Sequence, residues 1–167
     1  SRLAIIGLGS IGRRHLRLIS KLRPDIKVVI VRSGNGNYYE EERLALKTFS
    51  SVSEAIEFGV EAAIISSPAT FHLKQSLELA QQGVHLLIEK PLSHSSDGVQ
   101  ELLKAEKENN FVAMVGYVLR YDKGANKFKE WLVDKKIGKI LHARIECGSY
   151  LPDWRENQDY RKSVSAL

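Results

Sequence analysis

The sequence predicts an α/β fold in which helices cover both faces of a doubly wound parallel sheet. Short apolar runs rich in valine and isoleucine alternate with longer segments whose apolar residues recur at helical spacing. Strands that are apolar throughout are typical of a parallel sheet buried on both faces, and the alternation of strand and helix is typical of a doubly wound one. The predicted strands span residues 3–6, 27–31, 62–65, 85–88 and 112–115.

Helices are predicted between these strands from the spacing of their apolar residues. They span residues 10–22, 52–58, 70–82 and 95–108. Ser93 or Ser95 is the predicted N-cap of the last helix, because a serine hydroxyl can accept a hydrogen bond from the first helical turn. After Tyr117 the pattern changes to a helix over residues 122–135 and a half-exposed, alternating strand over residues 139–149.

The composition narrows the classes of function. The 167 residues are 43% hydrophobic and 27% charged, which is typical of a globular protein. The net charge of +5 is spread along the chain and forms no basic stripe of the kind that would predict nucleic-acid binding. No apolar run is long enough for a membrane span, and no signal peptide is expected. Cys147 is the only cysteine, which favours a cytoplasmic location.

A glycine-rich turn follows the first predicted strand and opens the first predicted helix. Gly7, Gly9 and Gly12 form the pattern G-x-G-x-x-G, with Leu8, Ser10 and Ile11 between them. In this context the first glycine permits a tight turn, the second lets backbone N–H groups approach a pyrophosphate, and the third allows close helix–sheet packing. The sequence therefore predicts a Rossmann-type dinucleotide site; the alternative is a structural turn without a ligand.

The end of the second strand bears on the choice of dinucleotide. NAD enzymes commonly carry Asp or Glu there to hold the ribose hydroxyls, whereas this strand ends in Arg32 and Ser33. A guanidinium group can pair with a 2′-phosphate. NADP is therefore favoured over NAD, and the alternative is a solvated arginine with the ribose bound in another way.

Two further strands end in polar residues at the edge where the cofactor would bind. Ser66, Ser67 and Pro68 follow the strand at 62–65. Glu89, Lys90 and Pro91 follow the strand at 85–88. A lysine at this place, such as Lys90, can hydrogen-bond a substrate hydroxyl or polarise a carbonyl group.

These motifs together resemble the glucose–fructose oxidoreductase, inositol dehydrogenase and MocA family. The resemblance lies in G-x-G-x-x-G followed by Arg14-His15, in S-P-A-T-F-H at 67–72, and in the glutamate-lysine-proline triplet. It implies hydride transfer between a nicotinamide cofactor and a hydroxyl carbon of a sugar, polyol or sugar nucleotide. It also implies cofactor contacts from Ser66, Pro68, His72 and Glu89, with Lys90 as the catalytic lysine.

The resemblance implies two domains. Residues 1–118 are the expected dinucleotide-binding domain, and residues 119–167 are the expected start of an α+β substrate domain with an antiparallel sheet, which the chain does not complete. The family's acid/base histidine is then expected beyond Leu167, and this part alone is expected to be inactive. Lower-ranked substrate contacts are Tyr117, Arg120, Trp154 and Arg161. The family's second-domain sheet also predicts a homo-oligomer.

Two other functions remain open at this point. One is a non-catalytic module that senses NAD(P). The glutamate-lysine-proline triplet disfavours it, because a sensing module has no need of a lysine beside the nicotinamide. The other is an S-adenosylmethionine-dependent transferase, which can also place a glycine turn after its first strand but leaves Lys90 without a task. No metal site is expected, because the five histidines and Cys147 are dispersed without metal-ligand spacing.

Overall fold

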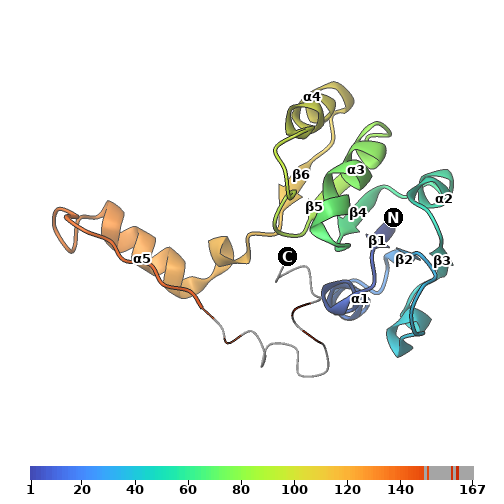
Figure 1. Ribbon diagram of the computed structural model, residues 1–167, viewed down its shortest axis with the longest axis horizontal. Helices are drawn as coiled ribbons and strands as arrows, with labels where there is room; N and C mark the ends of the chain where they lie inside the picture. Colours follow the sequence, from blue (N-terminus) through green and yellow to red (C-terminus); the bar gives the residue numbers. More distant parts are fainter. Residues whose placement is uncertain (149, 151–158, 160, 162–167) are drawn as a thin grey trace. The chain divides into compact units, whose positions relative to one another are not determined.

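The computed structural model describes residues 1–148, 150, 159 and 161. Its centre is a six-stranded parallel sheet in the order β3-β2-β1-β4-β5-β6 (Figure 1). The strands are β1 Arg2–Ile6, β2 Lys27–Val31, β3 Lys47–Phe49, β4 Ala62–Ile65, β5 His85–Ile88 and β6 Ala113–Val115. Because the chain runs outward from β1 in one direction and from β4 in the other, the sheet reverses between these two strands, where ligands of such folds bind. The doubly wound α/β prediction is confirmed.

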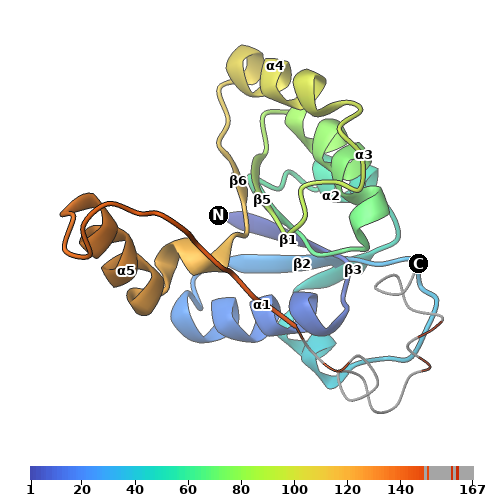
Figure 2. The same cartoon turned by 60° about the vertical axis from the view of Figure 1, so that its left-hand side comes forward.

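Helices form a layer on each face of the sheet (Figure 2). One layer holds α1 (Ser10–Leu22) and the 3-10 helix η1 (Glu40–Leu44); the other holds α2 (Val52–Glu57), α3 (Ala69–Ala80) and α4 (Val99–Asn109). Successive strand residues point to opposite faces, so Ile5 and Ile30 pack with Leu16 of α1, whereas Ile6 and Val29 join the core under α2, α3 and α4. Both faces are therefore buried, as expected for a parallel sheet.

Two parts of this region differ from the sequence prediction. Strand β3 was not predicted, because it has three residues and only Phe49 is buried. Helix α4 begins at Val99 rather than Ser95, directly after Gly98, whose φ of 82° is left-handed. Ser95 instead forms a turn in which its hydroxyl accepts a hydrogen bond from the N–H of Asp97 at 3.1 Å. The proposed N-cap at Ser93 or Ser95 was therefore wrong.

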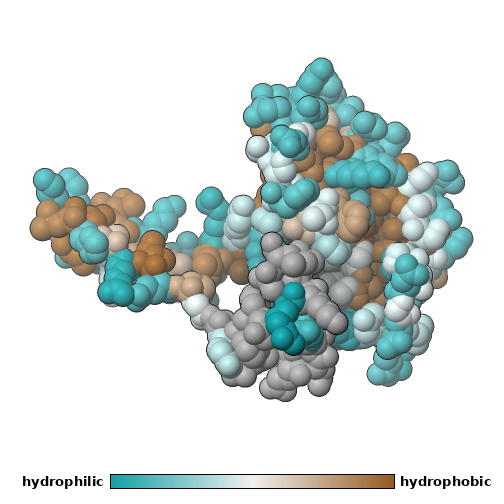
Figure 3. Space-filling model, in the orientation of Figure 1, coloured by the Kyte–Doolittle hydropathy of each residue, from teal (hydrophilic) through white to brown (hydrophobic). Residues whose placement is uncertain are grey.

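The structure divides into two units, Ser1–Tyr117 and Val118–Leu167. The described part of the second unit contains the 3-10 helix η2 (Val118–Tyr121) and helix α5 (Lys123–Val133), which exposes apolar residues (brown in Figure 3). The strand predicted at 139–149 was wrong for residues 139–148, which are irregular. Leu141 and Ile145 are 87% and 93% exposed, and the described residues of this unit offer no strand for pairing. Within the described chain, no helix has both the length and the apolar character that a bilayer requires.

Candidate nucleotide-binding site

The turn between β1 and α1 leaves the start of the helix open to an anion. Gly7 has a φ of 87°, and Gly9 precedes the helix in an extended conformation without any side-chain cap. The first turn of α1 contains no acidic residue. Free N–H groups and the helix dipole make such an end favourable for a phosphate.

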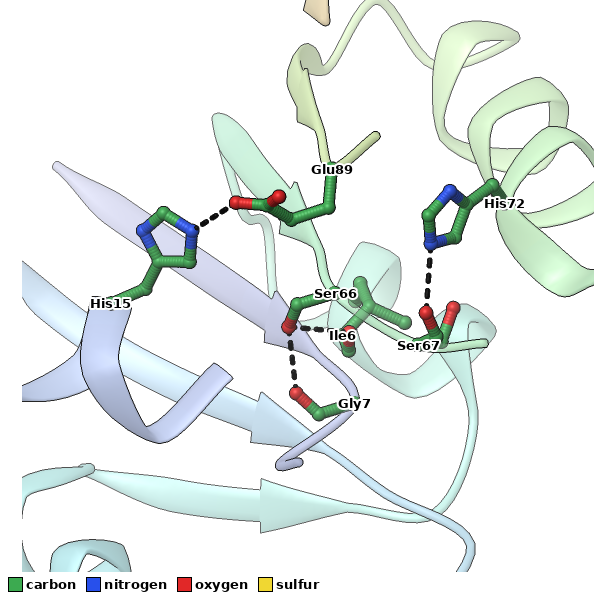
Figure 4. A network of polar contacts seen from close by, with 7 residues as sticks. All are labelled: Ile6, Gly7, His15, Ser66, Ser67, His72 and Glu89. Atoms are coloured by element: carbon green, nitrogen blue, oxygen red, sulfur yellow. Dashed lines mark hydrogen bonds and ion pairs between the residues drawn. The ribbon is translucent and has the colours of Figure 1, made fainter. Parts of the chain in front are cut away.

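Close packing holds this turn against the helix and against the neighbouring strand. A Cβ atom at Gly12 would lie 2.1 Å from the carbonyl oxygen of Gly7, and one at Gly7 would lie 2.7 Å from the backbone of Ser67. The Ser66 hydroxyl donates to the carbonyl oxygens of Gly7 at 2.8 Å and Ile6 at 3.1 Å (Figure 4). The ends of β1 and β4 are thereby joined at the place where the sheet order reverses.

A cavity of about 530 Å³ opens beside this turn, within the range of ligand-binding pockets. It is lined by Ile6, Gly7, Leu8, Gly9, Val31, Arg32, Ser33, Asn35, Tyr39, Ser50, Ser51, Val52, Ser67, Pro68, Phe71 and Gln75. A Cβ at Gly9 would meet no atom within 4 Å, so the missing side chain leaves open space. The residues and the space both fit a dinucleotide with its pyrophosphate at the start of α1.

Arg32 is held by its surroundings at one end of this cavity. Its guanidinium forms an ion pair with Glu42 and donates to the carbonyl oxygens of Asn37 at 3.1 Å and Asn35 at 3.3 Å. The guanidinium carbon lies 5.6 Å from the centre of the Tyr39 ring, and that of Arg13 lies 4.3 Å from it. The charge of Arg32 is therefore already compensated by a carboxylate.

The neighbouring Glu41 interacts with different arginines. It pairs with Arg17 and lies 3.8 Å from Arg13. Hydrogen bonding to its own backbone N–H, together with these arginines, holds the pKa of Glu41 below its usual value. The two adjacent glutamates thus have separate partners.

His72 joins two loops beneath the cavity wall. It is 2% exposed, and its Nε2 lies 2.7 Å from the carbonyl oxygen of Ser67 (Figure 4), while its Nδ1 lies 2.8 Å from that of Pro91. A neutral imidazole has one N–H, so only the protonated ring donates to both carbonyls. His72 does not line the cavity. It connects the loop before α3, through Ser67, to the loop after β5, through Pro91.

The end of β5 carries the lysine predicted to be catalytic. Glu89 contacts His15 of α1, with 2.8 Å between Oε1 and Nε2 (Figure 4), and both side chains are largely buried. Lys90 is exposed and has no hydrogen bond or ion pair to any described residue. Its peptide bond to Pro91 is cis. The Glu89 contact fixes the strand end, and the Lys90 ammonium group is available to a ligand.

The structure brings some of the predicted cofactor-binding residues together in the lining of the cavity. Predicted residues that line the cavity are Gly7, Leu8, Gly9, Arg32, Ser33, Ser67 and Pro68. Predicted residues outside its lining are Ser10, Ile11, Gly12, Ser66, His72, Glu89 and Lys90, all of them on α1, on α3 or at the ends of β4 and β5. The sequence analysis missed Tyr39, Asn35 and Gln75. Asn35 and Tyr39 lie between β2 and η1, Gln75 lies on α3, and none of them belongs to a recognisable motif.

Three of the four predicted substrate contacts lie among the described residues. Tyr117 is 50% exposed at the end of the first unit, and Arg120 lies in η2 of the second. Arg161 pairs with Asp159 at 2.9 Å, and Trp154 lies outside the described residues. Among the described residues, no three His, Cys, Asp or Glu side chains gather into a set that could hold a metal ion.

Residues 1–117 match the profile of the GFO/IDH/MocA family, described as an oxidoreductase family with an NAD-binding Rossmann fold. The chain belongs to this family. The oxidoreductase resemblance drawn from the glycine turn and the glutamate-lysine-proline triplet is thereby confirmed, as is the class of cofactor, a nicotinamide dinucleotide.

Relatives within the GFO/IDH/MocA family carry different names. An inositol 2-dehydrogenase/D-chiro-inositol 3-dehydrogenase of Halalkalibacterium halodurans is 29% identical over 91% of this chain and 47% of its own length. A 2,7-anhydro-N-acetylneuraminate hydratase of Mediterraneibacter gnavus is 28% identical over 93% and 40%. The solved myo-inositol 2-dehydrogenase of Lactobacillus plantarum superposes with a TM-score of 0.72 at 26% identity, covering 83% of this chain and 42% of that one. The chain thus spans less than half the length of these relatives.

Proposed function

We propose that this chain is the dinucleotide-binding part of an oxidoreductase that transfers hydride between a nicotinamide cofactor and a hydroxyl carbon of a sugar, polyol or sugar nucleotide. The observation that carries the proposal is the open cavity at an uncapped helix start, at the point where the sheet order reverses. Membership in an oxidoreductase family supports it.

Each part of the site has a task in this proposal. The N–H groups at the start of α1 bind the pyrophosphate, with Gly9 leaving the approach clear. Tyr39, Arg32 and Ser33 surround the adenosine end. The bound nicotinamide supplies the hydride chemistry. Lys90 hydrogen-bonds the reacting hydroxyl group and stabilises charge that develops on its oxygen.

The family relationship supports further proposals about the whole protein. Tyr117, Arg120, Trp154 and Arg161 are proposed to contact substrate, and an acid/base histidine is proposed beyond Leu167. A homo-oligomer formed through a second-domain sheet and a cytoplasmic location remain predictions. A dehydrogenase is favoured over a non-catalytic sensing module because Lys90 has no structural partner among the described residues, and a sensor has no use for a free ammonium group there.

Titration of the chain with NADH, followed by nicotinamide fluorescence, tests the cofactor site. The wild-type chain is expected to bind, and Gly9→Val is expected to abolish binding, because its side chain occupies the space left for the pyrophosphate. Gly148→Val is the matched control, since a Cβ at that exposed glycine also meets nothing within 4 Å. Equal binding by both variants would contradict this placement of the phosphates.

Lysine acylation, read by mass spectrometry, tests the place of Lys90. NADH is expected to slow modification of Lys90, because the nicotinamide ring covers the ammonium group. ADP-ribose, which lacks this ring, is expected to protect Lys90 less. Lys74, an exposed lysine on α3, serves as the control. Equal labelling of Lys90 with and without NADH would remove it from the proposed site.

A further inference from the structure

The position predicted to select NADP carries an arginine that is not free. Arg32 follows β2, where a 2′-phosphate of NADP would lie, and its side chain is only 13% exposed. Its guanidinium is bound by the Glu42 carboxylate and two backbone carbonyls. A phosphate could therefore reach this guanidinium only by displacing groups that already satisfy it.

Glu42 is fixed in its place by the backbone. Its Oε1 atom accepts a hydrogen bond from the N–H of Tyr39 at 3.0 Å, within the capping arrangement that begins η1. The side chain is 10% exposed, so water screens its charge only weakly. Arg32, which lines the cavity, and Glu42, which belongs to the 3-10 helix η1, thus form a neutral pair.

From this pair we infer that Glu42 determines the choice of dinucleotide, and that it disfavours NADP. The inference rests on the proposed function, because it concerns the adenosine end of the same site. A 2′-phosphate brings nearly two negative charges at neutral pH, and Glu42 both repels them and neutralises the cation that would bind them. The uncharged 2′-hydroxyl of NAD meets no such repulsion. The acid that is missing from the end of β2 is in effect supplied ten residues later by η1.

Glu41 provides a matched control for this inference. It is adjacent in sequence and carries the same charge, but it pairs with Arg17 and Arg13 rather than with Arg32. Removing its charge leaves the Arg32–Glu42 pair intact. A general effect of net charge on the binding of an anionic ligand would therefore be seen equally in Glu41→Gln and Glu42→Gln.

The test compares dissociation constants for NADH and NADPH at low ionic strength. The wild-type chain is expected to prefer NADH. Glu42→Gln is expected to raise the affinity for NADPH relative to NADH by about tenfold or more, the gain typical of one freed charge-assisted hydrogen bond. Glutamine retains an oxygen that can accept from Tyr39, so η1 is expected to persist. Glu41→Gln is expected to leave the ratio unchanged.

Combining Arg32→Gln with Glu42→Gln gives a double-mutant cycle that tests whether Glu42 acts through Arg32. In Arg32→Gln the Glu42→Gln change is expected to shift the ratio much less, because the cation that would bind the phosphate is gone and only the repulsion by Glu42 is relieved. An unchanged ratio in Glu42→Gln, an equal shift in Glu41→Gln, or a wild-type preference for NADPH would each overturn the inference alone. Failure of the wild-type chain to bind either dinucleotide would overturn the proposed function, and this inference with it.

Discussion

Two glycines of the first turn differ in what surrounds them. A Cβ at Gly12 would lie 2.1 Å from the Gly7 carbonyl oxygen and 2.8 Å from the Ser66 hydroxyl oxygen, whereas a Cβ at Gly9 meets no atom within 4 Å. Gly12 is therefore needed so that α1 can lie against the sheet, and Gly9 keeps space free for a ligand. One motif thus serves stability and binding at separate residues.

Gly12→Ala is expected to destabilise the protein by about 2–3 kcal/mol, because the added methyl group forces α1 away from a backbone atom that has little room to move. Denaturant unfolding measures this loss. Gly9→Ala is expected to cost less than about 1 kcal/mol, since alanine there is only a poorer N-cap. Equal losses in the two variants would contradict this division of tasks.

The site residues that could be predicted from the sequence are those close together in the chain. The turn from Gly7 to Gly12 is local, and its spacing alone predicts the open helix start. The environment of Arg32 could not be predicted, because its partner Glu42 reaches it across a loop of irregular structure. The two carbonyl contacts of His72 could not be predicted either, because they depend on how α3 packs against the loop after β5.

At the scale of elements, α2 shows how a short helix is stabilised at its start. The Ser51 hydroxyl accepts from the N–H of Glu54 at 3.3 Å, and the Glu54 carboxylate accepts from the N–H of Ser50 at 2.7 Å and of Ser51 at 3.3 Å. The hydrogen bond from the Ser50 backbone, followed by that from its hydroxyl, holds the pKa of Glu54 below its ordinary value of 4.5. This reciprocal cap favours a helix of only six residues.

The lowered pKa makes part of the stability depend on pH. Because the folded state favours the ionised carboxylate, the contribution of Glu54 is present above pH 4.5 and is lost as the pH falls below that value. Glu54→Gln is expected to lower the free energy of unfolding at neutral pH and to reduce its decline in acid, as measured by urea unfolding. Glu57→Gln, at the other end of α2, is expected to be neutral or slightly stabilising, since a carboxylate is unfavourable at a helix C-terminus.

Elements with a strong apolar pattern were predicted closely, and those without one were not. Helix α1 and strands β2, β4 and β5 have the predicted bounds. The strands are mostly apolar runs that the sheet buries, and α1 has its apolar residues at helical spacing, with Leu16 fully buried. The start of α4 was misplaced because serines also form turns, and the helix begins at Val99, directly after the left-handed Gly98. The segment 139–148 alternates like a strand, but alternation cannot supply the neighbouring backbone that pairing requires.

At the scale of the whole molecule, the cavity and the core belong to one unit. Every residue that lines the cavity lies between Ile6 and Gln75. Both buried apolar clusters are drawn from residues that precede Tyr117. The family match also ends at residue 117. Dinucleotide binding therefore needs no side chain of the described second unit to complete the cavity wall.

A chain that ends at Tyr117 is consequently expected to unfold cooperatively and to bind NADH with the affinity of the 167-residue chain. Its sheet retains all six strands, and the helices on both faces keep their apolar contacts. Thermal unfolding with and without NADH measures both properties, because a ligand that binds only the folded state raises the midpoint temperature. Cooperative unfolding without a shift by NADH, where the longer chain does shift, would show that residues after Tyr117 take part in binding.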